Sequence, residues 1–154
     1  MLENCDIKTR WGAVDELIER WLEERQSLIV QYCAISGIQT AQRSTNPERL
    51  QKFCQLLLDY VSAGHFEVYY EIIREAEAFE DGSADVAKTL LPKITAATQN
   101  ALDFNDTYAE CQHIDEPGIL AKDLSALGED FATRFDLEDQ LISALHSCHR
   151  EQVA

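Results

Sequence analysis

The sequence predicts an all-α protein, an antiparallel helical bundle of four to five long helices with one helix broken near Gly64. Apolar residues recur at steps of three and four along most of the 154 residues, which is the spacing of one helix face. The six glycines and three prolines are too few for a turn-rich β-sandwich. No stretch alternates apolar and polar residues as a half-buried strand does. One domain of residues 1–154 accounts for the whole chain.

The first expected helix covers residues 11–36. Charged residues fill one side of it, and the other side carries an apolar stripe of Trp11, Val14, Ile18, Trp21, Leu28 and Tyr32. Gly37 follows where a C-cap glycine commonly ends a helix. Residues 37–46 are polar, and we expect them to form a loop.

Asn46 and Pro47 predict the start of the second helix, because asparagine caps a helix and proline fits its first position. Gly64 interrupts the apolar stripe that follows, and glycine inside a helix costs about 1 kcal/mol relative to alanine. We therefore expect a kink or a short break at Gly64. The stripe on its two sides consists of Leu50, Phe53, Cys54, Leu57, Leu58 and Val61, and then of Phe66, Tyr69, Ile72 and Ile73.

Two further helices are expected in the second half of the chain. Residues 81–83 form a turn in which Ser83 can cap a helix from about Asp85 to Glu110. After a loop at 112–117, the last helix runs from about Pro117 to His149. Its core stripe is expected to be Leu120, Leu124, Leu127, Phe131, Phe135, Leu141, Ile142 and Leu145.

The charge of the chain restricts its partners. There are 28 acidic and 13 basic residues, and the net charge is -15. A protein that binds phosphate backbones needs a basic surface, so the composition argues against nucleic acid and against anionic membranes as partners. A basic protein is the expected partner. The N-terminus does not have the pattern of a signal peptide, and the five scattered cysteines are typical of reduced thiols, so we expect a cytoplasmic protein.

Residues that could support chemistry are few. A dinuclear metal site in a helical bundle needs two Glu-x-x-His motifs, and this chain has one, Glu110 to His113. Cys111 and His113, two residues apart, would point about 160° away from each other on a helix. His146 and His149 could share a face, but a frayed, polar helix end is the better explanation for them. With no catalytic motif either, we expect no metal, no cofactor and no enzymatic activity.

Residues 59–70 hold the densest group of unusual side chains. Three tyrosines, a histidine, a phenylalanine and Asp59 surround Gly64. Aromatic side chains at a kinked surface suit protein recognition, because they combine a large contact area with a polar tip. Core packing is the alternative, and for Phe66 the two interpretations are equally good. Trp11 and Trp21 are better explained as core residues.

Four stretches of the chain resemble the Rsd/AlgQ family, the bacterial regulators of the primary sigma factor. They are DYVSAGHFEVYYEI at 59–72, ERWLEERQ at 19–26, ALDFND at 101–106 and RFDLEDQLI at 134–142. The four motifs occur in the same order as in the family, and their amino-acid sequence is closest to that of its AlgQ-like pseudomonad branch. The loops at 39–45 and 112–118 carry no family motif.

The resemblance implies an all-helical anti-sigma factor that binds domain 4 of the housekeeping sigma factor. Such binding would block both promoter -35 recognition and docking on core polymerase, and so would redirect transcription as growth slows. We expect a 1:1 complex, with weak self-association left open. Two alternatives remain at this point: a regulatory module for another signalling protein, such as a stringent-response enzyme or a phosphocarrier protein, and a metalloenzyme built on a bundle.

The resemblance also implies which residues contact the partner, since they lie in the matched motifs. Asp59 is the strongest candidate, because a carboxylate near a kink can bind an arginine or lysine of a DNA-reading domain. Whether each candidate faces the partner or the core is not decided by sequence. The complete set is Arg20, Trp21, Asp59, Ser62, His65, Phe66, Tyr69, Phe135, Leu137 and Glu138.

Overall fold

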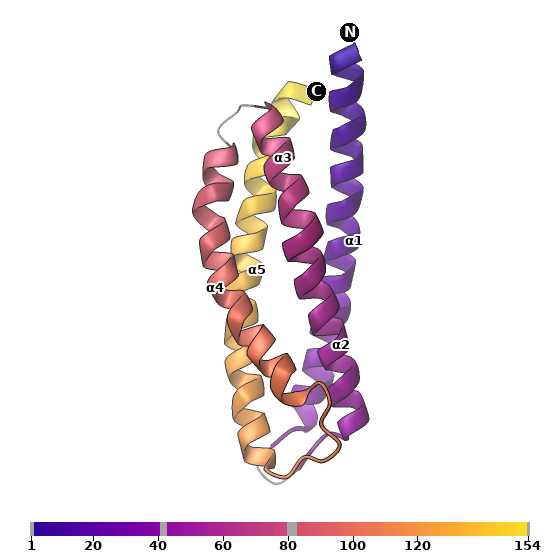
Figure 1. The fold of residues 1–154 in the computed structure, drawn as a ribbon, viewed down its shortest axis with the longest axis vertical. Helices are drawn as coiled ribbons and strands as arrows, with labels where there is room; N and C mark the ends of the chain where they lie inside the picture. The colour runs from indigo at the N-terminus through magenta and orange to yellow at the C-terminus, as the bar shows by residue number, and fades with distance from the viewer. Residues whose placement is uncertain (1, 41–42, 80–82, 154) are drawn as a thin grey trace.

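The structure, a computed structural model, consists of long helices arranged side by side (Figure 1). It describes the backbone of residues 2–40, 43–79 and 83–153. It also describes their side chains, except those of residues 2–11, 65–66, 76, 78–79, 83–84 and 146–153. These ranges contain no strand, so the predicted all-α fold is confirmed for them. None of the helices within these ranges combines the length and apolar character needed to cross a bilayer.

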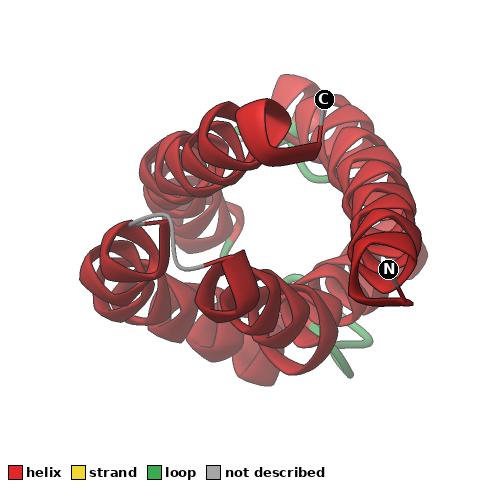
Figure 2. Cartoon of the chain, turned by 90° about the horizontal axis from the view of Figure 1, so that it is seen from above, coloured by secondary structure: helices red, strands yellow, loops and turns green. Residues whose placement is uncertain are grey.

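The helices alternate in direction along the chain. Figure 1 shows α1 (Leu2–Ile38) running down, α2 (Pro47–Ala63) and α3 (Tyr69–Phe79) running up, α4 (Ser83–Tyr108) running down and α5 (Pro117–Val153) running up. Between α2 and α3 the chain stays helical through one wide turn, Gly64–Val68, which has the hydrogen bonding of a π-helix. Seen from above, α1, α2 with α3, α4 and α5 form a ring of four columns (Figure 2). Within this ring α1 packs against α2, α3 and α5, and α4 lies diagonally opposite to it.

The start of α2 follows the prediction. Asn46 has extended backbone angles, and its side-chain oxygen accepts a hydrogen bond from the backbone N–H of Arg49 at 2.8 Å. Pro47 is the first helical residue. Proline has no N–H to leave unpaired there, so the pair begins the helix as expected.

Several predicted boundaries need correction. Gly37 does not end the first helix, because the backbone N–H of Gln39 still bonds the carbonyl of Ile35 at 2.9 Å and α1 continues to Ile38. At Gly64 the predicted kink or short break is confirmed in that α2 ends at Ala63, although the chain stays helical through the wide turn. Ser83 is the first residue of α4 and does not precede it, while the rest of the expected turn at 81–82 lies outside the described residues.

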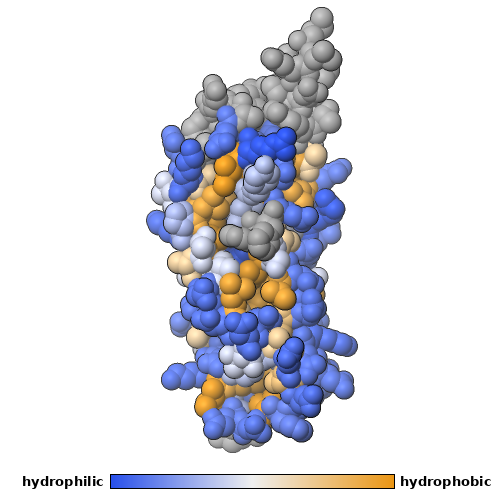
Figure 3. Space-filling view, in the orientation of Figure 1, coloured by the Kyte–Doolittle hydropathy of each residue, from blue (hydrophilic) through white to orange (hydrophobic). Residues whose placement is uncertain are grey.

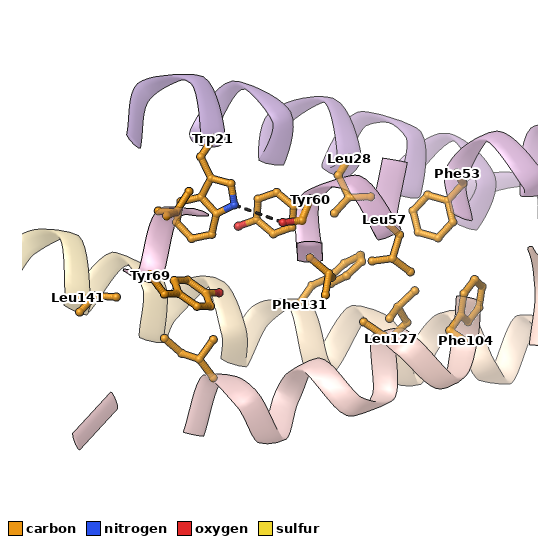
Figure 4. Close-up of a cluster of buried hydrophobic side chains, with 14 of the residues drawn as sticks. Trp21, Leu28, Phe53, Leu57, Tyr60, Tyr69, Phe104, Leu127, Phe131 and Leu141 are labelled. Carbon is orange, nitrogen blue, oxygen red and sulfur yellow. Dashed lines mark hydrogen bonds between the residues drawn. The ribbon is translucent and has the colours of Figure 1, made fainter. Parts of the chain in front are cut away.

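The last helix carries most of the predicted core stripe. Leu120, Leu124, Leu127, Phe131, Leu141 and Leu145 are buried, whereas Phe135 and Ile142 are half-buried at the edge of the core. Figure 4 shows Leu127 and Phe131 of α5 and Phe104 of α4 on one side of the core, with Leu57 and Phe53 of α2 on the other. Each fully buried side chain of this size contributes about 1.5–3 kcal/mol. Hydrophobic burial therefore holds the four columns together.

The face of the molecule seen in Figure 3 is hydrophilic along its flanks. In the view of Figure 3, blue side chains cover the flanks and hydrophobic ones gather along the seam in the middle. Such solvated faces are what the charge of the chain led us to expect.

Candidate functional site

Two of the buried charged residues, Arg134 and Glu138, form a pair inside the bundle. Arg134 is 2% exposed and Glu138 is 0% exposed, and they are one turn apart on α5. The guanidinium Nε lies 3.7 Å from a carboxylate oxygen of Glu138. A charge removed from water this completely is costly unless it is paired and hydrogen-bonded, so the surroundings of these two residues decide whether the fold tolerates them.

Three side chains from other helices form hydrogen bonds with this pair, although Arg134 Nε itself has no hydrogen-bond partner among the described residues. The Tyr60 hydroxyl donates to both carboxylate oxygens of Glu138, at 2.7 and 2.9 Å. The Tyr69 hydroxyl donates to Glu138 at 3.0 Å and accepts from Arg134 Nη2 at 2.9 Å. Arg134 Nη1 also donates to Thr98 Oγ1 of α4 at 3.1 Å. We call these five residues, together with Trp21, the buried polar cluster.

Trp21 closes the buried polar cluster from the α1 side. Its indole ring stacks on the Tyr60 ring at a centroid distance of 5.2 Å and meets the Tyr69 ring edge-on at 5.6 Å. Its N–H donates to the Tyr60 carbonyl at 3.4 Å, the dashed line in Figure 4. The cluster thus has members on α1, α2, α3, α4 and α5, which ties the columns together at one level of the bundle.

The electrostatics of the cluster favour neutral tyrosines. Burial raises the pKa of Tyr60, and the neighbouring Glu138 raises it further. Burial also raises the pKa of the Glu138 carboxyl, against the opposing effects of Arg134 and of the two tyrosine hydroxyls. The pKa of Arg134 stays above its usual value in spite of burial, because Tyr69 and Glu138 surround it. Arg134, Glu138, Tyr60 and Tyr69 are all buried, so we interpret the cluster as a structural network.

Gly64 approaches the cluster closely. A Cβ atom at this position would lie 3.2 Å from Arg134 Nη2, from a ring carbon of Trp21 and from the Tyr69 hydroxyl. Its backbone angles are ordinary for a right-handed helix. Glycine is needed here for space, and not for an unusual conformation.

The outer side of the same segment is acidic. Asp59 and Glu67 are exposed, and both raise the pKa of Glu24 on α1, although burial is the largest cause of that shift and Arg20 opposes it. We call Arg20, Glu24, Asp59 and Glu67 the acidic face. The Asp59 side chain accepts a hydrogen bond from Gln55, one turn earlier, at 2.9 Å.

A groove of about 380 Å³ continues the acidic face toward α3. Charged side chains of both signs line it, among them Arg20, Glu67, Glu71 and Arg74. Tyr70 lies one turn before Arg74 and is 62% exposed, the most exposed large hydrophobic side chain among the described residues. Carboxylates, arginines and an exposed aromatic ring can bind a charged protein surface.

The candidates on α5 point in three directions. Glu138 faces the buried polar cluster, and Phe135 lies toward α1, where the Arg25 guanidinium sits 5.0 Å from its ring centre. Leu137 follows Asp130 by two turns, and Asp130 accepts a hydrogen bond from Asn100 of α4. Leu137 therefore lies on the α4 side, and the three neighbours cannot form one surface.

The other candidates divide between surface and core. Arg20 and Asp59 are exposed and Ser62 is half-buried, whereas Trp21 and Tyr69 are buried. The side chains of His65 and Phe66 lie outside the described residues, and only their place in the wide turn is known. Among the described residues, no group of three or more His, Cys, Asp and Glu is arranged to hold a metal ion.

Comparisons with known proteins identify the family. Residues 1–146 match the family model described as "Regulator of RNA polymerase sigma(70) subunit, Rsd/AlgQ". The chain belongs to the Rsd/AlgQ family. It is 36% identical over 161 residues to a regulator of sigma D from Yersinia pseudotuberculosis, covering 100% of this chain and 95% of the relative. It is 40% identical over 149 residues to one from an Enterobacter species, covering 93% and 88%.

In this Rsd/AlgQ chain, sequence reasoning missed Arg134 as a core residue. The buried positions of α5 continue as Leu127, Phe131, Arg134, Glu138 and Leu141, in regular steps of three and four. This spacing is visible in the sequence and could have placed the two charged residues in the buried stripe. Glu24, Glu67 and Tyr70 were not named as contact residues, and the proximity of Glu24 to Glu67 depends on how α1 packs against the wide turn.

Proposed function

We propose that this protein is an anti-sigma factor that binds domain 4 of the housekeeping sigma factor through the acidic face and the groove beside it. Domain 4 reads the promoter -35 element with a helix-turn-helix, and a DNA-reading surface carries lysines and arginines. Occupying that surface would block -35 recognition and docking on core polymerase. The role is one of binding, with no catalytic step.

The observation that carries this proposal is the grouping of exposed carboxylates on one face. Glu24, Asp59 and Glu67 come from α1, α2 and the wide turn, and they lie close enough for Asp59 and Glu67 to act on the charge of Glu24. Repulsion within such a group is relieved when a basic partner binds it. Membership in a family of sigma(70) regulators supports the identity of that partner.

The candidate residues then take two kinds of role. Arg20, Asp59 and Ser62 contact the sigma factor directly, and His65 and Phe66 remain candidates for contact. Trp21, Tyr69 and Glu138 shape the face from inside the bundle. Phe135 and Leu137, half-buried on other sides of α5, pack at the edge of the core. The chain acts as one sigma-binding domain in a 1:1 complex, in the cytoplasm where RNA polymerase works.

Substitution of Asp59 tests the proposal. Asp59→Ala and Asp59→Asn should weaken binding of purified domain 4 by at least about tenfold, which is about 1.4 kcal/mol, because a charge-assisted contact is lost. Thermal unfolding should change little, since surface substitutions are usually within about 0.5 kcal/mol. Calorimetric titration and a melting curve on the same samples give both quantities.

Asp103 provides a matched control. It is also exposed, and it accepts the same kind of hydrogen bond, from Gln99 one turn earlier at 2.9 Å, but it lies on α4, diagonally opposite to α1. Asp103→Ala removes an equal charge and should leave domain 4 binding near the wild-type level. Equal losses in both variants would mean that only net charge matters. Full binding by Asp59→Ala would exclude Asp59 from the interface.

A further inference from the structure

Tyr60 and Tyr69 could not share Glu138 if their helix were regular. Nine residues correspond to about 2.5 turns of an α-helix, which would put the two side chains on opposite faces. The wide turn removes this conflict. The backbone N–H of Tyr69 bonds the carbonyl of Gly64, five residues earlier, so the turn takes up one extra residue. The two rings then stand about 80° apart, and both hydroxyls reach Glu138.

The same extra residue changes the outer surface. Asp59 and Glu67 are eight residues apart, which in a regular α-helix would separate them by about 80° around the axis. With one residue taken up by the wide turn, they are separated by only about 20°. The two carboxylates therefore lie on nearly the same side of the helix axis. This is consistent with the finding that both raise the pKa of Glu24.

Resting on the proposed function, we propose that Gly64 and Tyr69 are positioning residues for sigma binding: they hold the wide turn against Arg134 and Glu138 and so align Glu67 with Asp59. Tyr69 anchors the turn through its hydrogen bonds to Arg134 and Glu138. Gly64 leaves the space that those two side chains and Trp21 occupy. The interior of the bundle thereby sets the arrangement of charges on its surface.

Gly64→Ala distinguishes this proposal from a simple effect on helix stability. Alanine favours a helix by about 1 kcal/mol over glycine, so propensity alone predicts a higher melting temperature and unchanged binding. Three contacts at 3.2 Å predict instead that the cluster shifts and the turn moves. Binding of domain 4 should then fall by about tenfold, the effect of one misplaced charge-assisted contact.

Gly37→Ala is the matched control. Gly37 is also helical, and a Cβ atom there would meet nothing within 4 Å. This variant should show the effect of helix propensity with no change in binding. Tyr69→Phe gives a second test if Gly64→Ala does not fold, because it keeps the ring and removes both hydrogen bonds of the hydroxyl.

A second measurement does not require the sigma factor. The pKa of the Glu24 carboxyl, followed by NMR titration, should move toward its ordinary value in Gly64→Ala and in Tyr69→Phe, because Glu67 turns away from it. Wild-type binding together with a wild-type Glu24 titration in a folded Gly64→Ala or Tyr69→Phe variant would overturn the inference. If wild-type protein does not bind domain 4, the proposed function fails, and the Glu24 titration still decides the positioning role.

Discussion

Arg134 and Glu138 form an ion pair in the interior of the bundle, one turn apart on α5, with both side chains almost completely buried. Their hydrogen bonds reach Tyr60 on α2, Tyr69 on α3 and Thr98 on α4. An ion pair of this kind adds little net stability compared with apolar residues of similar size. However, each of the two residues needs the other, because removing one leaves the remaining charge buried and unpaired.

Arg134→Met should destabilise the protein by about 3–5 kcal/mol, because Glu138 is left buried without its cation. The double variant Arg134→Met, Glu138→Met should recover most of the loss, since Glu138 is no longer left buried without its cation. Urea unfolding followed by circular dichroism measures both. A double variant as unstable as the single one would show that the hydrogen bonds, and not the charge, make the pair necessary.

The pH dependence of stability should reflect Glu138. Burial raises its pKa above the ordinary value of 4.5, so the folded state binds this proton more tightly than the unfolded state does. Stability from this group is therefore fully present below about pH 4.5 and is lost as pH rises through the folded pKa. Burial also raises the pKa values of Glu24 and Asp130, which act in the same direction.

We accordingly expect a higher urea midpoint at pH 5 than at pH 7. In Glu138→Gln, which keeps the shape and cannot ionise, the difference between the two pH values should shrink. A wild-type midpoint that rises from pH 5 to pH 7 would contradict the predicted sign.

Gly128→Ala should destabilise the protein, although alanine is the better helix former. The Tyr32 ring of α1 lies directly over Gly128, and its hydroxyl donates to the Leu124 carbonyl of α5 at 2.7 Å. A methyl group would overlap the Tyr32 side chain, and such overpacking typically costs about 1–3 kcal/mol. Thermal unfolding gives the change. Adding Tyr32→Leu to Gly128→Ala should recover stability, and failure of this rescue would point to a different cause.

Tyr70→Ala should weaken domain 4 binding by more than about 1 kcal/mol and leave the melting temperature nearly unchanged. Tyrosine contributes strongly to interfaces, and this ring is exposed beside the groove. Ile119→Ala removes a similarly exposed side chain near the start of α5 and serves as the control. Equal binding by wild type and Tyr70→Ala would place the interface elsewhere.

The parts of the fold that depend on neighbouring residues in the sequence could be predicted. Asn46 and Pro47 begin a helix through contacts within four residues, and the structure confirms them. The role of Gly64 could be predicted only in part. Its low helix propensity indicated the interruption of the helix, whereas the need for glycine comes from the proximity of Tyr69 and of Trp21 and Arg134 on other helices.

The candidate site shows the same limit. Family motifs pointed to residues 59–72, but burial separates Tyr69 inside the bundle from Asp59 and Tyr70 outside it. Adjacent tyrosines on a helix face different surroundings, and the register of the wide turn decides which one enters the core. That register depends on Arg134 and Glu138, more than sixty residues further along the chain.

The buried polar cluster also bears on the order of folding. The contacts between successive columns of an up-and-down bundle join segments close in sequence, and such contacts form early. The cluster needs all four columns in place before Arg134 and Glu138 can leave water, so it should form after the rate-limiting step. Interactions that form so late slow unfolding and leave the folding rate nearly unchanged. Arg134→Met should therefore unfold faster and refold at about the wild-type rate in stopped-flow experiments. The cluster then contributes kinetic stability, because it slows the unfolding of the assembled bundle.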